Sequence, residues 1–240
     1  MVDKAWRELG RLYMERAKRL DPWRATLHGI AHTQLRNVNN DREAIEVLHK
    51  ISPSPGKTSC PLDKSALEKL AGLGFHNPTL TGETLCDKVK YADEWLKALK
   101  SCNRRRLMHM KMEGVNVYGL RWKGIDMSLL DAGCENPVID IHMARYMARE
   151  DPEFLRALGL EKYDPSLVAK RIKAIHDSPN PAKYDELWER AVKRALSEGV
   201  PPGEWHVAIW LKERFSSMYP ELSEEAKLEL ARRYVEKLFS

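Results

Sequence analysis

The chain has 240 residues, of which 43% are hydrophobic and 31% charged, and its formal net charge is +5. This length is enough to bury a core in one large or two small domains, and the mildly basic balance permits a polyanionic partner without requiring one. No apolar run reaches the length of a membrane span, and charged residues interrupt the N-terminus before a signal sequence could form. We therefore expect an intracellular, cytoplasmic protein that does not enter a membrane.

The cysteines and histidines do not have the spacing of a metal site. Cys60, Cys86, Cys102 and Cys134 are far apart and form no CxxC pair, which argues against a zinc knuckle or an iron-sulfur loop. We expect reduced core thiols and neither a metal nor another cofactor. Gln34 is the only glutamine beside many Lys, Arg and Glu residues, a bias typical of proteins from hot environments.

Apolar residues recur at intervals of three and four along most of the chain, as on one face of a helix. Asp-Pro pairs at 21–22, 151–152 and 164–165 provide an N-cap followed by a first-turn proline. The expected helices are 4–20, 23–35, 41–51 (capped by Asp41), 63–73, 81–99, 141–149, 152–158, 165–175, 181–197, 203–216 and one after Ser223. No segment has a period of two, so we predict an all-α fold of about ten helices.

A basic cluster precedes the central part of the chain, with three arginines at positions 104–106 after Asn103. Such clusters are usually the solvated start of a helix, and this is the interpretation that we adopt. Contact with a phosphate group is the alternative.

The stretch 117–143 combines a turn at Gly119, a lysine at 123, a helix-length segment, a Gly-Cys-Glu-Asn-Pro break and an apolar run that ends in Asp140. An amine and a carboxylate on successive helices suit chemistry in which the amine attacks a carbon atom while the acid balances the developing charge. Each has a simpler interpretation: lysines after turns are usually exposed, and an aspartate before a helix is usually only a cap.

This order of features resembles the helix-hairpin-helix DNA glycosylase superfamily. Residues 119–123 resemble the hairpin and its lysine, and residues 137–142 resemble the aspartate motif, seventeen residues after Lys123. The resemblance implies a two-lobed helical bundle with a helix-hairpin-helix motif and a DNA cleft between the lobes. One lobe would be about 22–136, and the other would combine the N-terminal helix with about 137–240 in a single glycosylase unit.

Other segments share the resemblance. Residues 21–51 are similar to the early helix pair of the superfamily, so His32, Gln34 and Asn39 are candidate base or DNA contacts, or else ordinary polar residues of caps and core. Residues 74–75 and 88–92 are similar to two further segments of the superfamily. Residues 200–210 look like the closing helix of archaeal 8-oxoguanine glycosylases, where Trp205 is a core residue or flanks a pocket.

The resemblance implies specific roles for the central residues. Lys123 would attack the sugar C1′ and form a Schiff base, and burial or the neighbouring Arg121 would lower its pKa. Asp140 would stabilise the positive sugar, and its place before a helix favours the ionised form. Gly119 would belong to the phosphate-binding hairpin, and His142 is either a partner of these residues or a surface residue.

Two alternatives concern the nucleophile. A hairpin at 114–116 would put Tyr118 at the lysine position and leave no amine nucleophile, and Lys111, just before the hairpin, is a further candidate.

The leading functional interpretation is a monomeric, nucleoid-associated glycosylase and AP lyase that removes an oxidised purine, 8-oxoguanine, from damaged double-stranded DNA. The absence of a four-cysteine iron-sulfur loop favours this oxoguanine branch. The alternatives are a monofunctional glycosylase for a deaminated or alkylated base, a non-catalytic helix-hairpin-helix DNA-binding module, and a helical scaffold that binds no nucleic acid.

Overall fold

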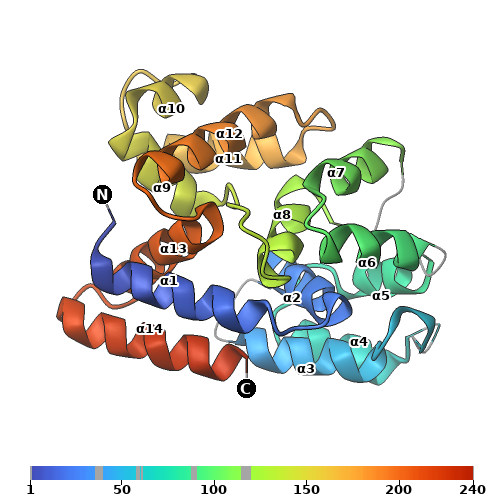
Figure 1. The fold of residues 1–240 in the computed structure, drawn as a ribbon. Helices are drawn as coiled ribbons and strands as arrows, with labels where there is room; N and C mark the ends of the chain where they lie inside the picture. Colours follow the sequence, from blue (N-terminus) through green and yellow to red (C-terminus); the bar gives the residue numbers. More distant parts are fainter. Residues whose placement is uncertain are drawn as a thin grey trace. The chain divides into compact units, whose positions relative to one another are not determined.

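The computed structural model describes residues 2–35, 40–57, 60, 62–87, 91–114 and 120–239. Within these ranges the chain forms fourteen α-helices and no strand, which confirms the predicted all-α class (Figure 1). Among the described residues, no helix is long and apolar enough to cross a membrane. The chain divides into two compact units: unit 1 comprises 1–16 and 133–240, and unit 2 comprises 17–132.

Unit 2 is organised around its first helix, which is buried on most sides and packs on the last helix of the unit. The tryptophans of its core are anchored by their ring nitrogens: Trp95 Nε1 donates to Thr26 Oγ1 at 2.9 Å, and Trp23 Nε1 donates to the Ser52 carbonyl at 2.7 Å. The helices of unit 2 are α2 (Pro22–Gln34), α3 (Asp41–Ile51), the 3₁₀ helix η2 (Pro55–Lys57), α4 (Lys64–Gly72), α5 (Pro78–Asp87), α6 (Ala92–Lys100), α7 (Arg104–Met112) and α8 (Trp122–Asp131).

Unit 1 is built around α13, which has more buried residues than any other helix of the unit. The helices of unit 1 are α1 (Lys4–Ala17), α9 (Ile141–Glu150), α10 (Pro152–Ala157), α11 (Pro165–Asp177), α12 (Ala182–Ser197), α13 (Pro202–Met218) and α14 (Glu224–Leu238). The first and last helices lie side by side (Figure 1), and the rings of Tyr13 and Phe239 meet edge to face with centroids 4.8 Å apart. Burial of Trp6, Trp205 and Tyr184 supplies much of the apolar core.

Most predicted helix starts are confirmed because capping is a local interaction. A side-chain oxygen of the residue before the helix accepts backbone N–H groups of the first turn, which have no partner inside the helix. This bond is formed by Asp21, Asp63, Asp140, Asp151, Asp164 and Ser223.

Two local predictions are wrong. The single helix expected over 81–99 is two helices, α5 and α6, and α5 begins earlier because Asn77 caps it ahead of Pro78, its Oδ1 accepting Leu80 N–H at 3.0 Å. Asp41 does not cap α3; Asn40 precedes that helix, and Asp41 is its first residue, only 1% exposed. The described residues therefore form more helices than the expected ten.

The basic cluster is only partly solvated. Asn103 caps α7 as a helix start should, and Arg105 is exposed. Arg104 instead forms two hydrogen bonds, of 2.8 and 3.3 Å, to the carboxylate of Asp126, which is fully buried on α8. This bidentate pair ties α7 to α8, because a buried carboxylate requires a charged partner.

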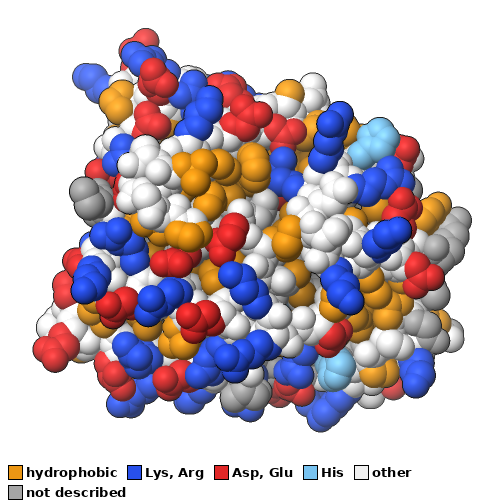
Figure 2. Space-filling model, in the orientation of Figure 1, with side chains coloured by type: hydrophobic (Ala, Val, Ile, Leu, Met, Phe, Trp, Pro, Cys, Tyr) orange, Lys and Arg blue, Asp and Glu red, His pale blue; other side chains and the backbone are white. Residues whose placement is uncertain are grey.

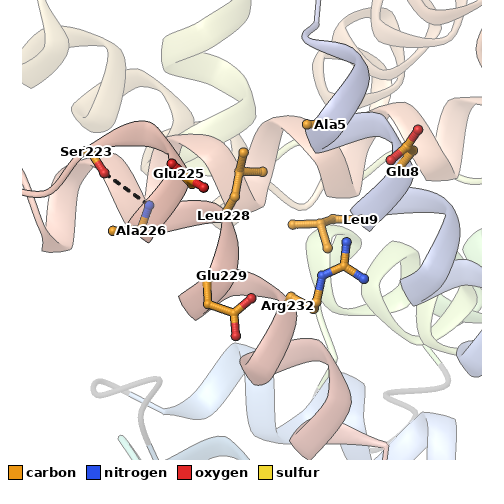
Figure 3. A pocket seen from close by; sticks show the side chains of 9 residues that line it. All are labelled: Ala5, Glu8, Leu9, Ser223, Glu225, Ala226, Leu228, Glu229 and Arg232. Atoms are coloured by element: carbon orange, nitrogen blue, oxygen red, sulfur yellow. Dashed lines mark hydrogen bonds between the residues drawn. The ribbon is translucent and has the colours of Figure 1, made fainter.

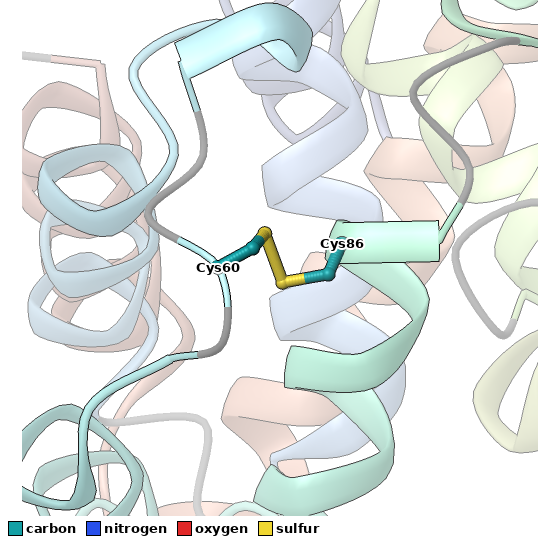
Figure 4. The surroundings of a disulfide bond; sticks show 2 residues. All are labelled: Cys60 and Cys86. Carbon is teal, nitrogen blue, oxygen red and sulfur yellow. A yellow bond between two sulfur atoms is a disulfide. The ribbon is translucent and has the colours of Figure 1, made fainter.

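The expectation of reduced cysteines is wrong. Cys60 and Cys86 form a disulfide between the segment after η2 and the last turn of α5, with Cα atoms 5.7 Å apart (Figure 4). Cys102 and Cys134 are also oxidised, so no cysteine is free. Spacing along the chain could not reveal the Cys60–Cys86 pairing, because 26 positions separate the two residues.

Candidate functional site

Lys123 lies in the first turn of α8, where it is half-buried. The helix begins at Trp122, directly after Arg121, which occupies the N-cap position without a side-chain capping bond. The next residue, Gly124, packs closely on α2: a Cβ atom there would lie 3.2 Å from Thr33 Cγ2 and 2.7 Å from Leu120 Cδ2. The turn that carries Lys123 is therefore held against the core of unit 2.

Lys111 is the other lysine of interest. It lies in the last turn of α7 and is half-buried. Burial and, secondly, the positive charge of Arg121 lower the pKa of Lys111. A lowered pKa increases the fraction of neutral amine, the form that acts as a nucleophile.

Asp140 is the N-cap of α9 in unit 1, and its side chain is nearly inaccessible, with the residue 5% exposed. Its Oδ1 accepts the Met143 N–H at 2.8 Å, so the carboxylate lies at the positive end of a helix. The capping interpretation is therefore correct for one of its oxygens. His142, the second residue of α9, is half-buried.

His32 lies in the interior of unit 2, between two buried carboxylates. Its Nδ1 is 3.2 Å from Asp131 Oδ2, and its Nε2 is 3.6 Å from Asp41 Oδ2; the two aspartates are 0% and 1% exposed. Both ring nitrogens face carboxylates that belong to α8 and α3. His32 therefore links three helices, and its contacts are with the core of the unit.

Trp205 does not offer a face to a base, because it is completely buried in unit 1. Its Nε1 donates to Glu198 Oε2 at 3.2 Å, and its ring meets Tyr146 edge to face. Of the two interpretations of this residue, the core position is the one observed.

Gln34, Asn39 and Gly119 are the remaining candidates from the sequence. Gln34 ends α2 and is half-buried, and its carbonyl accepts the His76 N–H at 2.8 Å. Asn39 and Gly119 lie outside the described residues.

A hollow of about 510 Å³ lies between α1 and α14, and none of these candidates lines it (Figure 3). Its floor includes Leu9 and Leu228, whereas Glu8, Glu225 and Glu229 line it with a single arginine, Arg232. Three carboxylates against one cation would repel a phosphate backbone. This hollow is therefore not a suitable nucleic-acid site.

Charge on the visible surface is mixed in sign. On the face shown in Figure 2, Lys and Arg side chains alternate with Asp and Glu, and no broad area is uniformly basic. Binding of a polyanion on this face would depend on a few local contacts instead of a large positive field.

No group of three or more His, Cys, Asp or Glu side chains among the described residues is arranged to hold a metal ion. Comparison of the chain with protein-family models, curated proteins and solved structures gives no match. The functional argument therefore depends on the residues themselves.

Proposed function

We propose that the protein is a DNA glycosylase with AP-lyase activity that removes an oxidised purine, 8-oxoguanine, from double-stranded DNA. The observation that carries the proposal is the placement of Lys123 in the first turn of one helix and Asp140 at the N-cap of the next, in the order that resembles the helix-hairpin-helix glycosylases. A fold of short helices that start at Asp, Asn or Ser caps is compatible with this resemblance.

The Lys123 environment supports the proposed nucleophile in two respects. The close packing at Gly124 fixes the backbone next to the lysine, and its half-buried position leaves part of the side chain accessible to a substrate. A fixed backbone reduces the entropy lost when the amine is brought to the reacting carbon.

In the proposed reaction, the nucleotide leaves the base stack so that its sugar becomes accessible. The neutral amine forms a bond to C1′ while the bond from C1′ to the base breaks, and the base leaves with a proton. Opening of the sugar ring yields a Schiff base, and loss of a C2′ proton expels the 3′ phosphate. Asp140 stabilises the positive charge that develops on the sugar.

Borohydride trapping tests the nucleophile, because reduction converts the Schiff base into a stable covalent adduct. With duplex DNA that contains 8-oxoguanine, we expect an adduct with the wild type and with Lys111→Gln, and none with Lys123→Gln. Loss of the adduct in Lys111→Gln but not in Lys123→Gln would identify Lys111, whose lowered pKa makes it the alternative. No adduct with the wild type would exclude the lyase mechanism.

A base-release screen over a panel of lesion duplexes separates the remaining functions. Base release without strand cleavage would indicate a monofunctional glycosylase. Salt-dependent DNA binding without base release from any lesion would indicate a non-catalytic DNA-binding module.

A further inference from the structure

We propose that His206 and His176, together with Tyr184, position the Asp140 carboxylate by holding the backbone directly before it. This inference rests on the proposed function for its catalytic meaning. The three residues come from α13, α11 and α12, far from Asp140 in sequence.

The segment before Asp140 needs such partners because it is buried and is neither helix nor strand. Val138 and Ile139 are 0% exposed, and the backbone from 136 to 140 has no regular structure. Backbone N–H and C=O groups buried in this way must find hydrogen-bond partners, and no neighbouring strand supplies them.

Side chains satisfy three of the six backbone groups from Val138 N–H to Asp140 C=O, and other backbone groups satisfy the remaining three. The Val138 N–H donates to His206 Nδ1 at 3.3 Å, the Ile139 N–H to Tyr184 Oη at 3.4 Å, and His176 Nε2 donates to the Ile139 carbonyl at 2.7 Å. The Val138 carbonyl accepts the Asp140 N–H at 3.0 Å, and the Asp140 carbonyl accepts the Ala144 N–H within α9 at 2.9 Å. Every backbone group from Val138 N–H to Asp140 C=O therefore has a partner.

The hydrogen bonds indicate which ring nitrogen carries a hydrogen in each imidazole. Nδ1 of His206 accepts the hydrogen bond from Val138 N–H, so the ring hydrogen of His206 lies on Nε2. A carbonyl oxygen can only accept, so His176 carries a hydrogen on Nε2. The two rings hold consecutive peptide groups from different helices. They thereby set the direction in which the chain enters α9 and the position of its N-cap carboxylate.

The decisive variant is His206→Leu, which replaces the imidazole with an apolar side chain of similar volume and so removes the acceptor for Val138 N–H. Val207→Ala is the matched control, because Val207 is fully buried on the same helix and its side chain has no group that can form a hydrogen bond. His206→Asn is the rescue, since asparagine Oδ1 branches from the same Cγ atom as imidazole Nδ1. His176→Leu, at a half-buried site, provides a second test if His206→Leu does not fold.

The first readout is single-turnover base release from the lesion duplex. We expect His206→Leu to be slower by at least about 10-fold, because a displacement of about 1 Å at a catalytic group can cost about 100-fold in rate. Val207→Ala should stay within about 3-fold of the wild type at matched temperature below unfolding, and His206→Asn should recover most of the rate. Equal losses in His206→Leu and Val207→Ala would overturn the proposal.

The second readout does not depend on activity. Hydrogen exchange of the peptide that spans 136–140 should become faster in His206→Leu and His176→Leu, but not in Val207→Ala. If the wild type releases no base, the proposed function fails, and exchange alone decides whether the histidines hold this segment. Unchanged exchange in both histidine variants would then overturn the inference as well.

Discussion

The two histidines on successive turns of α2 have different surroundings, although both are buried. His32 lies between the carboxylates of Asp41 and Asp131. His28 is 0% exposed and meets His32 edge to face, with ring centroids 6.1 Å apart. Burial lowers the pKa of His28 from its ordinary 6.5 to about 4, although the negative charge of Asp131 opposes the shift.

The low pKa of His28 predicts a loss of stability in acid. Below about pH 6.5 the unfolded chain binds a proton at His28 that the folded protein does not bind until the pH nears 4. The free energy of unfolding therefore falls as the pH is lowered from about 6.5 to about 4. The difference between the two pKa values corresponds to about 3 kcal/mol. Urea unfolding at pH 7 and pH 4 should show this loss in the wild type and a smaller one in His28→Gln.

The exposed His109 on α7 supplies the control for this prediction. His109→Gln should keep the pH dependence of the wild type. An identical pH dependence in the wild type and in His28→Gln would show that His28 is not the group responsible.

At the scale of elements, the packing of α2 on α8 is the most extensive helix contact within unit 2. The two helices can approach this closely only because position 29 is glycine. A Cβ atom on Gly29 would lie 2.1 Å from Ser128 Oγ and 3.1 Å from Ser128 Cα. Because the obstacle includes backbone, neither helix can avoid it by changing a rotamer. Glycine is normally unfavourable inside a helix, but here the helices could not pack this closely without it.

We therefore expect Gly29→Ala to lower the free energy of unfolding by about 1–3 kcal/mol, as overpacking of a close interface does. Gly72→Ala is the matched control, because Gly72 is also helical, at the end of α4, and a Cβ atom there would meet nothing within 4 Å. It should be neutral or stabilise by up to about 1 kcal/mol through helix propensity. Urea unfolding of both variants measures the contrast, and similar values for the two would contradict this account of the interface.

At the scale of the whole molecule, the protein combines oxidised cysteines with a composition rich in charged residues. Disulfides persist in oxidising compartments and also in intracellular proteins of hyperthermophiles. A chain with one glutamine and 31% charged residues has the composition expected of the second group. The intracellular location and the hot habitat stay predictions from the sequence.

The Cys60–Cys86 disulfide should stabilise unit 2 by restricting its unfolded state. A closed loop of 26 positions corresponds to about 3.5 kcal/mol in the chain-entropy description, or a melting temperature higher by about 7–14 °C for a protein of this size. The double variant Cys60→Ser/Cys86→Ser should melt lower by this amount in calorimetry. Lys64→Ser, at an exposed position nearby, should melt like the wild type; an equal melting temperature in the double variant would contradict the prediction.

Part of the candidate site could be predicted from sequence because its signals are local. Lys123 after a turn and Asp140 before a helix are visible in a few consecutive residues, and both lie in the predicted helical context. His206 and His176 could not be found in this way, since their partners, Val138 and Ile139, are 68 and 37 positions away.

The sequence by itself determined the all-helical class and most helix starts, because apolar periodicity and capping act over four residues or fewer. Only the tertiary structure decided that Asp41 is buried beside His32, that Arg104 neutralises Asp126, and that Cys60 is bonded to Cys86. Each of these pairs joins residues that only folding brings near, so no local pattern reveals them. For Asp126 the physical reason is that burial makes an unpaired charge costly, and the compensating cation comes from another helix.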